Sequence, residues 1–77
     1  MIVSMQPADL EADDPMTAAV GRYLGSTWFW VTRTHVVVRV GSGMARRLPL
    51  PAAAVRWLAL YDGGYSLPPL SFEMPNP

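Results

Sequence analysis

The side chains that could act as a general base near neutral pH or bind a metal are one histidine and six carboxylates, and the chain has no cysteine. Catalysis requires a nucleophile, a base and an orienting group in one place. His35, the only histidine, lies in a run of β-branched residues and is expected to be an ordinary strand residue. Asp9, Glu11 and Asp13 alternate as in a calcium loop, but no glycine stands at the sharp turn and no glutamate closes the loop. The sequence therefore predicts no catalytic residue, no metal site, no cofactor and no enzymatic activity.

The aromatic run Trp28-Phe29-Trp30 and the arginines near it are better suited to binding. In a strand, alternate side chains face opposite ways, so Trp28 and Trp30 share one face and Phe29 takes the other. Tryptophan and arginine are enriched at interface hot spots. Two interpretations stay open: the helices and the tail cover both faces as core, or the run is exposed for a partner. The second interpretation predicts a partner-binding surface made of Trp28, Trp30, Arg33, Arg39, Arg46 and Arg47.

The chain is formally neutral, but its charges are separated along the sequence. Asp9, Glu11, Asp13 and Asp14 are four of the six acids, and all six basic residues are arginines that follow them. We expect residues 7–14 to form a solvated acidic loop. This loop could imitate phosphates and occupy a nucleic-acid channel, a hypothesis separate from anchoring by the tryptophans and arginines.

Direct nucleic-acid binding is a second hypothesis for the aromatic and arginine residues. Tryptophans can stack on bases while arginines bind phosphates, as in single-strand binders. The zero net charge counts against this hypothesis. An acidic loop on so small a body would also repel phosphates unless it lay on the opposite face. We therefore rank nucleic-acid binding below protein binding.

The first of two predicted helices spans residues 15–24. Asp13 or Asp14 can cap its N-terminus, and Pro15 occupies the first helical position, where a missing N–H costs nothing. Gly25 can take the left-handed conformation that ends a helix. This helix should pack one apolar face on the rest of the domain.

The second predicted helix spans residues 51–61 and stops at two glycines that follow Asp62. Arg56 is its only charge, so it is apolar on nearly every side. It must be covered on more than one side. Either it packs between the sheet and the first helix, or part of it meets another molecule.

Residues 1–6 and 27–48 have the composition of strands, with β-branched and aromatic residues prevailing in the second range. Residues 27–40 could be one long strand, but we favour two strands joined near Arg33 and Thr34. Gly41-Ser42-Gly43 should form the next hairpin turn. It is not a phosphate loop, because it lacks the lysine and the helix that such a loop needs.

The tail, residues 65–77, holds four of the eight prolines and should be extended. Pro68-Pro69 could serve as a polyproline ligand, but we favour a tail packed on its own domain. It would lie along the surface or add an edge strand at Ser71 to Met74. The sequence thus predicts a single α+β domain over residues 1–77, with a small antiparallel sheet of three to four strands, two helices packed on it and an extended Pro-rich tail.

The size of the chain favours association with a partner. A domain of 77 residues buries only about 60% of the surface of its unfolded chain. Packing or a partner must therefore supplement the core. The chain could be a small subunit of an obligate oligomer, and a homodimer is one option. Residues 1–6 lack the basic start of a secretory signal, and the apolar stretch 48–61 falls short of the roughly 20 residues that span a bilayer. We expect a cytoplasmic protein without a membrane partner.

In its length, its lack of cysteine and catalytic groups, and its arginine- and alanine-rich composition, the chain resembles the small inhibitor proteins of phages and other bacterial mobile elements. Anti-CRISPR proteins are the best-known group of these. The resemblance implies a non-enzymatic protein that docks on a host protein or nucleoprotein complex in the host cytoplasm and blocks it. It assigns no role to any particular residue.

Overall fold

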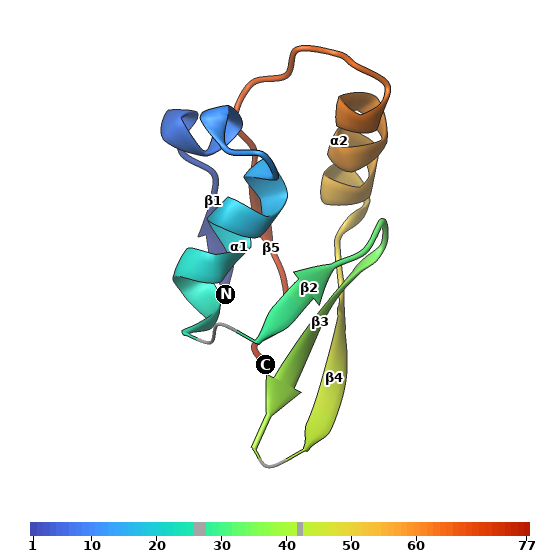
Figure 1. Ribbon diagram of the computed structural model, residues 1–77. Helices are drawn as coiled ribbons and strands as arrows, with labels where there is room; N and C mark the ends of the chain where they lie inside the picture. Colours follow the sequence, from blue (N-terminus) through green and yellow to red (C-terminus); the bar gives the residue numbers. More distant parts are fainter. Residues whose placement is uncertain (26–27, 42) are drawn as a thin grey trace.

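The computed structural model describes residues 1–25, 28–41 and 43–77 and has an α+β fold in these ranges (Figure 1). The fold class expected from the sequence is therefore confirmed. Thr27 and Ser42, expected at the start of the strand region and in a turn, lie outside the described residues. The elements are, in order, β1 (Ile2–Ser4), the 3-10 helix η1 (Pro7–Glu11), α1 (Pro15–Leu24), β2 (Phe29–Val31), β3 (His35–Val40), β4 (Met44–Pro49), α2 (Ala52–Asp62) and β5 (Ser71–Glu73).

The described strands form two antiparallel sheets where the sequence predicted one sheet of three to four strands. β1 pairs with β5, so that Val3 lies opposite Phe72, and the three-stranded sheet has the order β2-β3-β4. The second sheet arises because the tail returns to the other end of the chain. Backbone hydrogen bonds extend this pairing from the Met5 amide to the Leu70 carbonyl and from the Met74 amide to the Met1 carbonyl.

Helix α1 begins and ends at local sequence signals and spans the residues expected for the first helix. The Asp14 carboxylate accepts a hydrogen bond from the Thr17 amide, and Gly25 ends the helix with a φ of 63°. Gly21 brings the helix close to β2, since a Cβ at this position would lie 3.2 Å from the Phe29 ring. The helix therefore lies against both β1 and β2 (Figure 1).

The core collects apolar side chains from both sheets and both helices. α1 contributes one face, whereas each strand contributes alternate residues, as the two periodicities require. Truncating a fully buried side chain of this kind costs about 2–5 kcal/mol, so each element is held by its share of this cluster. The cluster consists of Val3, Met5, Met16, Ala19, Val20, Val36, Val38, Leu48, Leu50, Ala54, Trp57, Phe72 and Met74.

Helix α2 is buried on one side only, although its apolar composition predicted burial on more than one side. Only Ala54 and Trp57 are buried, and Leu60 is 37% exposed. The Trp57 indole donates a hydrogen bond of 2.9 Å to the Pro68 carbonyl and stacks on Tyr61. The helix is thus tied to the chain that follows it, and its far side faces outward. Among the described residues, no helix has the length and apolarity needed to cross a membrane.

Candidate binding surface

The three-stranded sheet has one face in the core and one face outside it. Register places Phe29 beside Val38 and Val31 beside Val36, and both valines belong to the buried core. The intervening residues take the opposite face, because side chains alternate along each strand. This outer face consists of Trp28, Trp30, His35, Val37, Arg39, Ala45, Arg47 and Pro49.

The two tryptophans are exposed on this outer face and are not part of the core. Trp28 is 48% exposed and Trp30 is 47% exposed, whereas Phe29 on the inner face is half-buried and packs against the core. The alternative that the aromatic run is covered on both sides is therefore wrong. Because side chains alternate along β2, Phe29 packs toward the core while Trp30 stays exposed on the opposite face.

The exposed indoles hold fixed positions relative to each other and to an arginine. The rings of Trp28 and Trp30 meet edge to face, with centroids 5.6 Å apart. The guanidinium carbon of Arg39 lies 4.2 Å from the centroid of the Trp28 ring, a cation–π contact. Because these contacts already order the side chains, a partner that binds here loses less conformational entropy.

Val37 lies between the tryptophans and the arginines and was not among the residues singled out from the sequence. It pairs with Trp30 on one side and with Arg47 on the other. It is only 7% exposed, yet it is not a member of the core cluster. Neighbouring side chains on the outer face therefore bury Val37. The sequence alone could not single out this residue, because its position between Trp30 and Arg47 follows from the hairpin register.

Four of the six expected partner-binding residues share the outer face, and two arginines do not. Arg46 pairs with Val38 and so projects from the opposite side of β4, where it is exposed. Arg33 lies in the turn between β2 and β3. The expectation of one surface holding all four arginines fails because Arg46 and Arg47 are adjacent in a strand and must point opposite ways.

The outer face is positively charged and lacks acids. Residues 28–49 include Arg33, Arg39, Arg46 and Arg47 but no aspartate or glutamate. The ion pair found in the described part of the chain involves other residues, Asp9 and Arg22, so Arg39 and Arg47 keep their charge for a partner. Opposite charge on that partner would be attracted to this face.

Asp9 cannot act as a phosphate mimic, because it is buried and already bound. Residues 7–11 form η1 and not the expected solvated loop, and Asp9 is 5% exposed. Its carboxylate accepts hydrogen bonds of 2.7 Å from Nη2 of Arg22 and from the Gln6 amide. The Arg22 hydrogen bond lowers the pKa of Asp9 against the opposing effect of burial, and the Gln6 amide assists. Arg22 is distant in sequence, so nothing local signalled this pairing.

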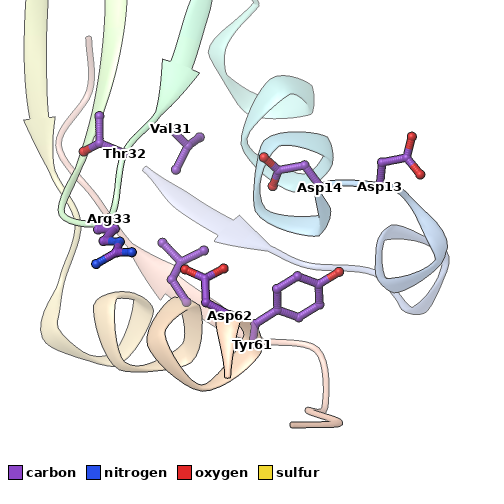
Figure 2. Close-up of a pocket in the computed structure, with 8 residues that line it drawn as sticks. Asp13, Asp14, Val31, Thr32, Arg33, Tyr61 and Asp62 are labelled. Atoms are coloured by element: carbon purple, nitrogen blue, oxygen red, sulfur yellow. The ribbon is translucent and has the colours of Figure 1, made fainter. Parts of the chain in front are cut away.

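The remaining acids of this segment are exposed and lie elsewhere. Asp13 and Asp14 face a hollow of about 460 Å³, with Tyr61 and Asp62 of α2 across it and Arg33 at its side (Figure 2). The hollow is also lined by Val31, Thr32 and Leu58. Glu11 is exposed at the end of η1. Of the proposed phosphate mimics, three therefore remain accessible and one does not.

His35 lies at the start of β3, where its Nδ1 is 2.7 Å from the Thr34 hydroxyl. The described residues hold no group of three or more histidine, aspartate or glutamate side chains placed to bind a metal ion.

No known protein family, curated protein or solved structure matches this chain. Arguments about function therefore rest on its own surface.

Proposed function

We propose that this protein is a non-enzymatic protein-binding module that docks its outer face on an acidic surface of a partner protein and blocks that partner. The observation that supports this most is the ordered set of Trp28, Trp30 and Arg39, half-exposed or exposed on a sheet face without acids. The resemblance to small phage inhibitors adds the expectation that the partner is a host protein or nucleoprotein complex.

The residue types on this face are those that dominate binding energy in protein interfaces. Tryptophan and arginine are the commonest hot-spot residues, and a hot spot costs about 2 kcal/mol or more when truncated. Val37 is covered, so the exposed apolar surface of this face comes from Trp28 and Trp30, and the charges of Arg39 and Arg47 lie beside it. Such a patch fits a partner with an apolar contact surrounded by carboxylates.

Protein binding is favoured over base stacking by the state of the Trp28 ring. Arg39 already occupies a position over that ring, and Trp30 meets it edge to face. A nucleic-acid base would have to displace Arg39 to stack on the face of the Trp28 ring that Arg39 covers. A carboxylate can instead approach Arg39 while the ring contact persists.

Selection from a random peptide library on the immobilised protein tests this proposal. We expect the wild type to enrich acidic peptides with apolar residues. The double variant Trp30→Ala, Arg47→Gln should bind the best of these at least about tenfold more weakly, since about 1.4 kcal/mol corresponds to a factor of ten. Arg56→Gln on α2 removes an exposed charge away from the face and is the matched control.

Two results would overturn the proposal. The first is equal binding of the selected peptides to the wild type and to the folded double variant. The second is tighter binding of a single-stranded oligonucleotide than of any selected peptide, with steep salt dependence, which would establish the nucleic-acid function instead.

A further inference from the structure

We propose that β4 is an edge at which an extended acidic segment of the partner adds a strand, with two consecutive carboxylates facing Arg46 and Arg47. The inference rests on the proposed function, because it needs a protein partner at the neighbouring outer face. It adds a backbone contact to the side-chain contacts of that face and specifies the conformation of the bound segment.

β4 is the open border of the three-stranded sheet. It pairs with β3 on one side, and the sheet order places no strand on its other side in the described part of the chain. Figure 1 shows β4 on the side of the hairpin away from α1. Residues Met44, Ala45, Arg46 and Arg47 are all exposed. β2 ends the sheet on the other side, but it is shorter and has α1 against it.

The direction of each backbone group on β4 follows from the hydrogen bonds of β3. The Arg39 amide donates to Trp28, and the His35 carbonyl accepts from Thr32, so odd-numbered residues of β3 face β2. Even-numbered residues of β3 therefore face β4 and pair with its even-numbered residues, among them Arg46. The N–H and C=O groups of Ala45 and Arg47 consequently point away from the sheet.

Outward N–H and C=O groups on two alternate residues form a template for one more strand. An extended peptide satisfies them by exchanging hydrogen bonds, as in other cases of strand addition. A nucleic acid has no corresponding ladder of amides and carbonyls. The arginines alone would attract any anionic partner, but the exposed backbone groups of β4 favour an acidic polypeptide over a nucleic acid.

Arg46 and Arg47 determine the charge of that polypeptide. They point to opposite faces of the sheet, so the residues opposite them on an added strand are consecutive and also point to opposite faces. Opposite charges placed directly across a strand pair are stabilising. The added segment should therefore contain two adjacent acidic residues, flanked by residues that favour strands.

A second copy of this chain fits the edge poorly. The antiparallel pairing of β4 with itself that satisfies the outward groups of both Ala45 and Arg47 pairs these two residues with each other. It places Arg46 of one copy directly opposite Arg46 of the other, and residues 28–49 supply no acid to separate them. Like charges across a strand pair are destabilising. Arginines on an exposed edge also protect it against such self-association.

The experiment uses the full isotope-labelled protein and the capped peptide Thr-Val-Glu-Glu-Val-Thr. In the free protein, the amides of Ala45 and Arg47 should exchange with solvent faster than that of Arg46. Saturating peptide should slow the exchange of Ala45 and Arg47 at least about tenfold. N-methylation of the first glutamate and the second valine, whose amides would face β4, should abolish this protection. N-methylation of the first valine and the second glutamate is the matched control and should preserve it.

Ala45→Pro provides a test from the side of the protein. This change removes an outward N–H and leaves the pairing with β3 intact, and proline is tolerated in an edge strand at such a position. Peptide binding should weaken at least about tenfold. If the variant does not fold, the two N-methylated peptides still decide the matter.

The outcomes separate the inference from the proposed function. Equal binding of both N-methylated peptides, with loss of binding in the outer-face double variant, would overturn strand addition and leave docking on the face in place. Absence of peptide protection at Ala45 and Arg47 would also overturn strand addition. A dimer whose formation protects these amides without peptide would replace the acidic segment by a second copy.

Discussion

Arg39 and Trp28 are joined twice across neighbouring strands. The Arg39 amide donates a hydrogen bond of 3.1 Å to the Trp28 carbonyl, and its guanidinium carbon lies 4.2 Å from the centroid of the Trp28 ring. The backbone contact fixes the register, and the side-chain contact fixes the orientation of the indole. An exposed tryptophan directly before β2 is thereby held in one place.

Replacing Arg39 by methionine should affect binding more than stability. An exposed cation–π contact contributes about 0.5–1 kcal/mol, so the free energy of unfolding should fall by no more than that. Affinity for the selected acidic peptides should fall at least about tenfold, because the charge facing the partner is lost. Denaturant unfolding and a peptide titration measure the two effects. An equal loss of affinity in Arg56→Met would show that total charge, and not the outer face, controls binding.

The ion pair between Asp9 and Arg22 should make the free energy of unfolding decrease at low pH. The pKa of Asp9 is lowered in the folded protein, so its contribution is complete above the unfolded value of about 3.9 and is lost as pH falls through the folded value. Wild-type stability should therefore drop from about pH 4 downward, and Asp9→Asn should show a flatter profile with a lower plateau at neutral pH. Asp13→Asn should keep the wild-type slope. Parallel profiles for wild type and Asp9→Asn would contradict this role.

The cap at Asp14 should contribute measurably to α1. Its carboxylate accepts a hydrogen bond of 3.1 Å from the Thr17 amide. Asp14→Ala should cost about 1 kcal/mol, whereas Asp14→Ser keeps an acceptor and should cost less. The neighbouring Asp13→Ala should change stability by less than about 0.5 kcal/mol. Thermal unfolding of the three variants distinguishes these cases, and equal melting temperatures would remove the cap from the explanation.

The C-terminal strand should be part of the cooperative fold. Phe72 is 6% exposed and lies opposite Val3 in the two-stranded sheet. Phe72→Ala should lower the free energy of unfolding by about 3–5 kcal/mol. If that variant does not fold, Phe72→Leu can be measured in its place and should lower it by about 1 kcal/mol. Leu67→Ala changes a half-buried residue of the same tail and should cost less than Phe72→Ala. An unfolding curve of Phe72→Ala that matches that of the wild type would show that the tail does not stabilise the domain.

Helices were the part of the fold that the sequence predicted best, because their signals are local. Asp14, Pro15 and Gly25 mark the two ends of α1 within a few residues of each other. The expected helix over 51–61 differs from α2 by one residue at each end. Capping and stop signals depend on neighbours in the chain and need no knowledge of the tertiary structure.

Pairings between distant residues were the part that the sequence could not supply. The two-stranded sheet joins the ends of the chain, and composition gives no register for such a pairing. Asp9 looked like one more solvated acid because its partner Arg22 lies in another element. The tryptophans were correctly placed on one face by alternation, but exposure of that face and the separation of Arg46 from it depended on the hairpin register.

Amide and indole chemical shifts, followed while the best selected peptide is titrated into the isotope-labelled protein, show most directly where a partner docks. We predict that the largest changes fall on Trp28, Trp30, Arg39 and Arg47, including the indole N–H signals of both tryptophans. Changes confined to Asp13, Asp62 and the other residues around the hollow, with the outer face unaffected, would contradict the proposed binding surface.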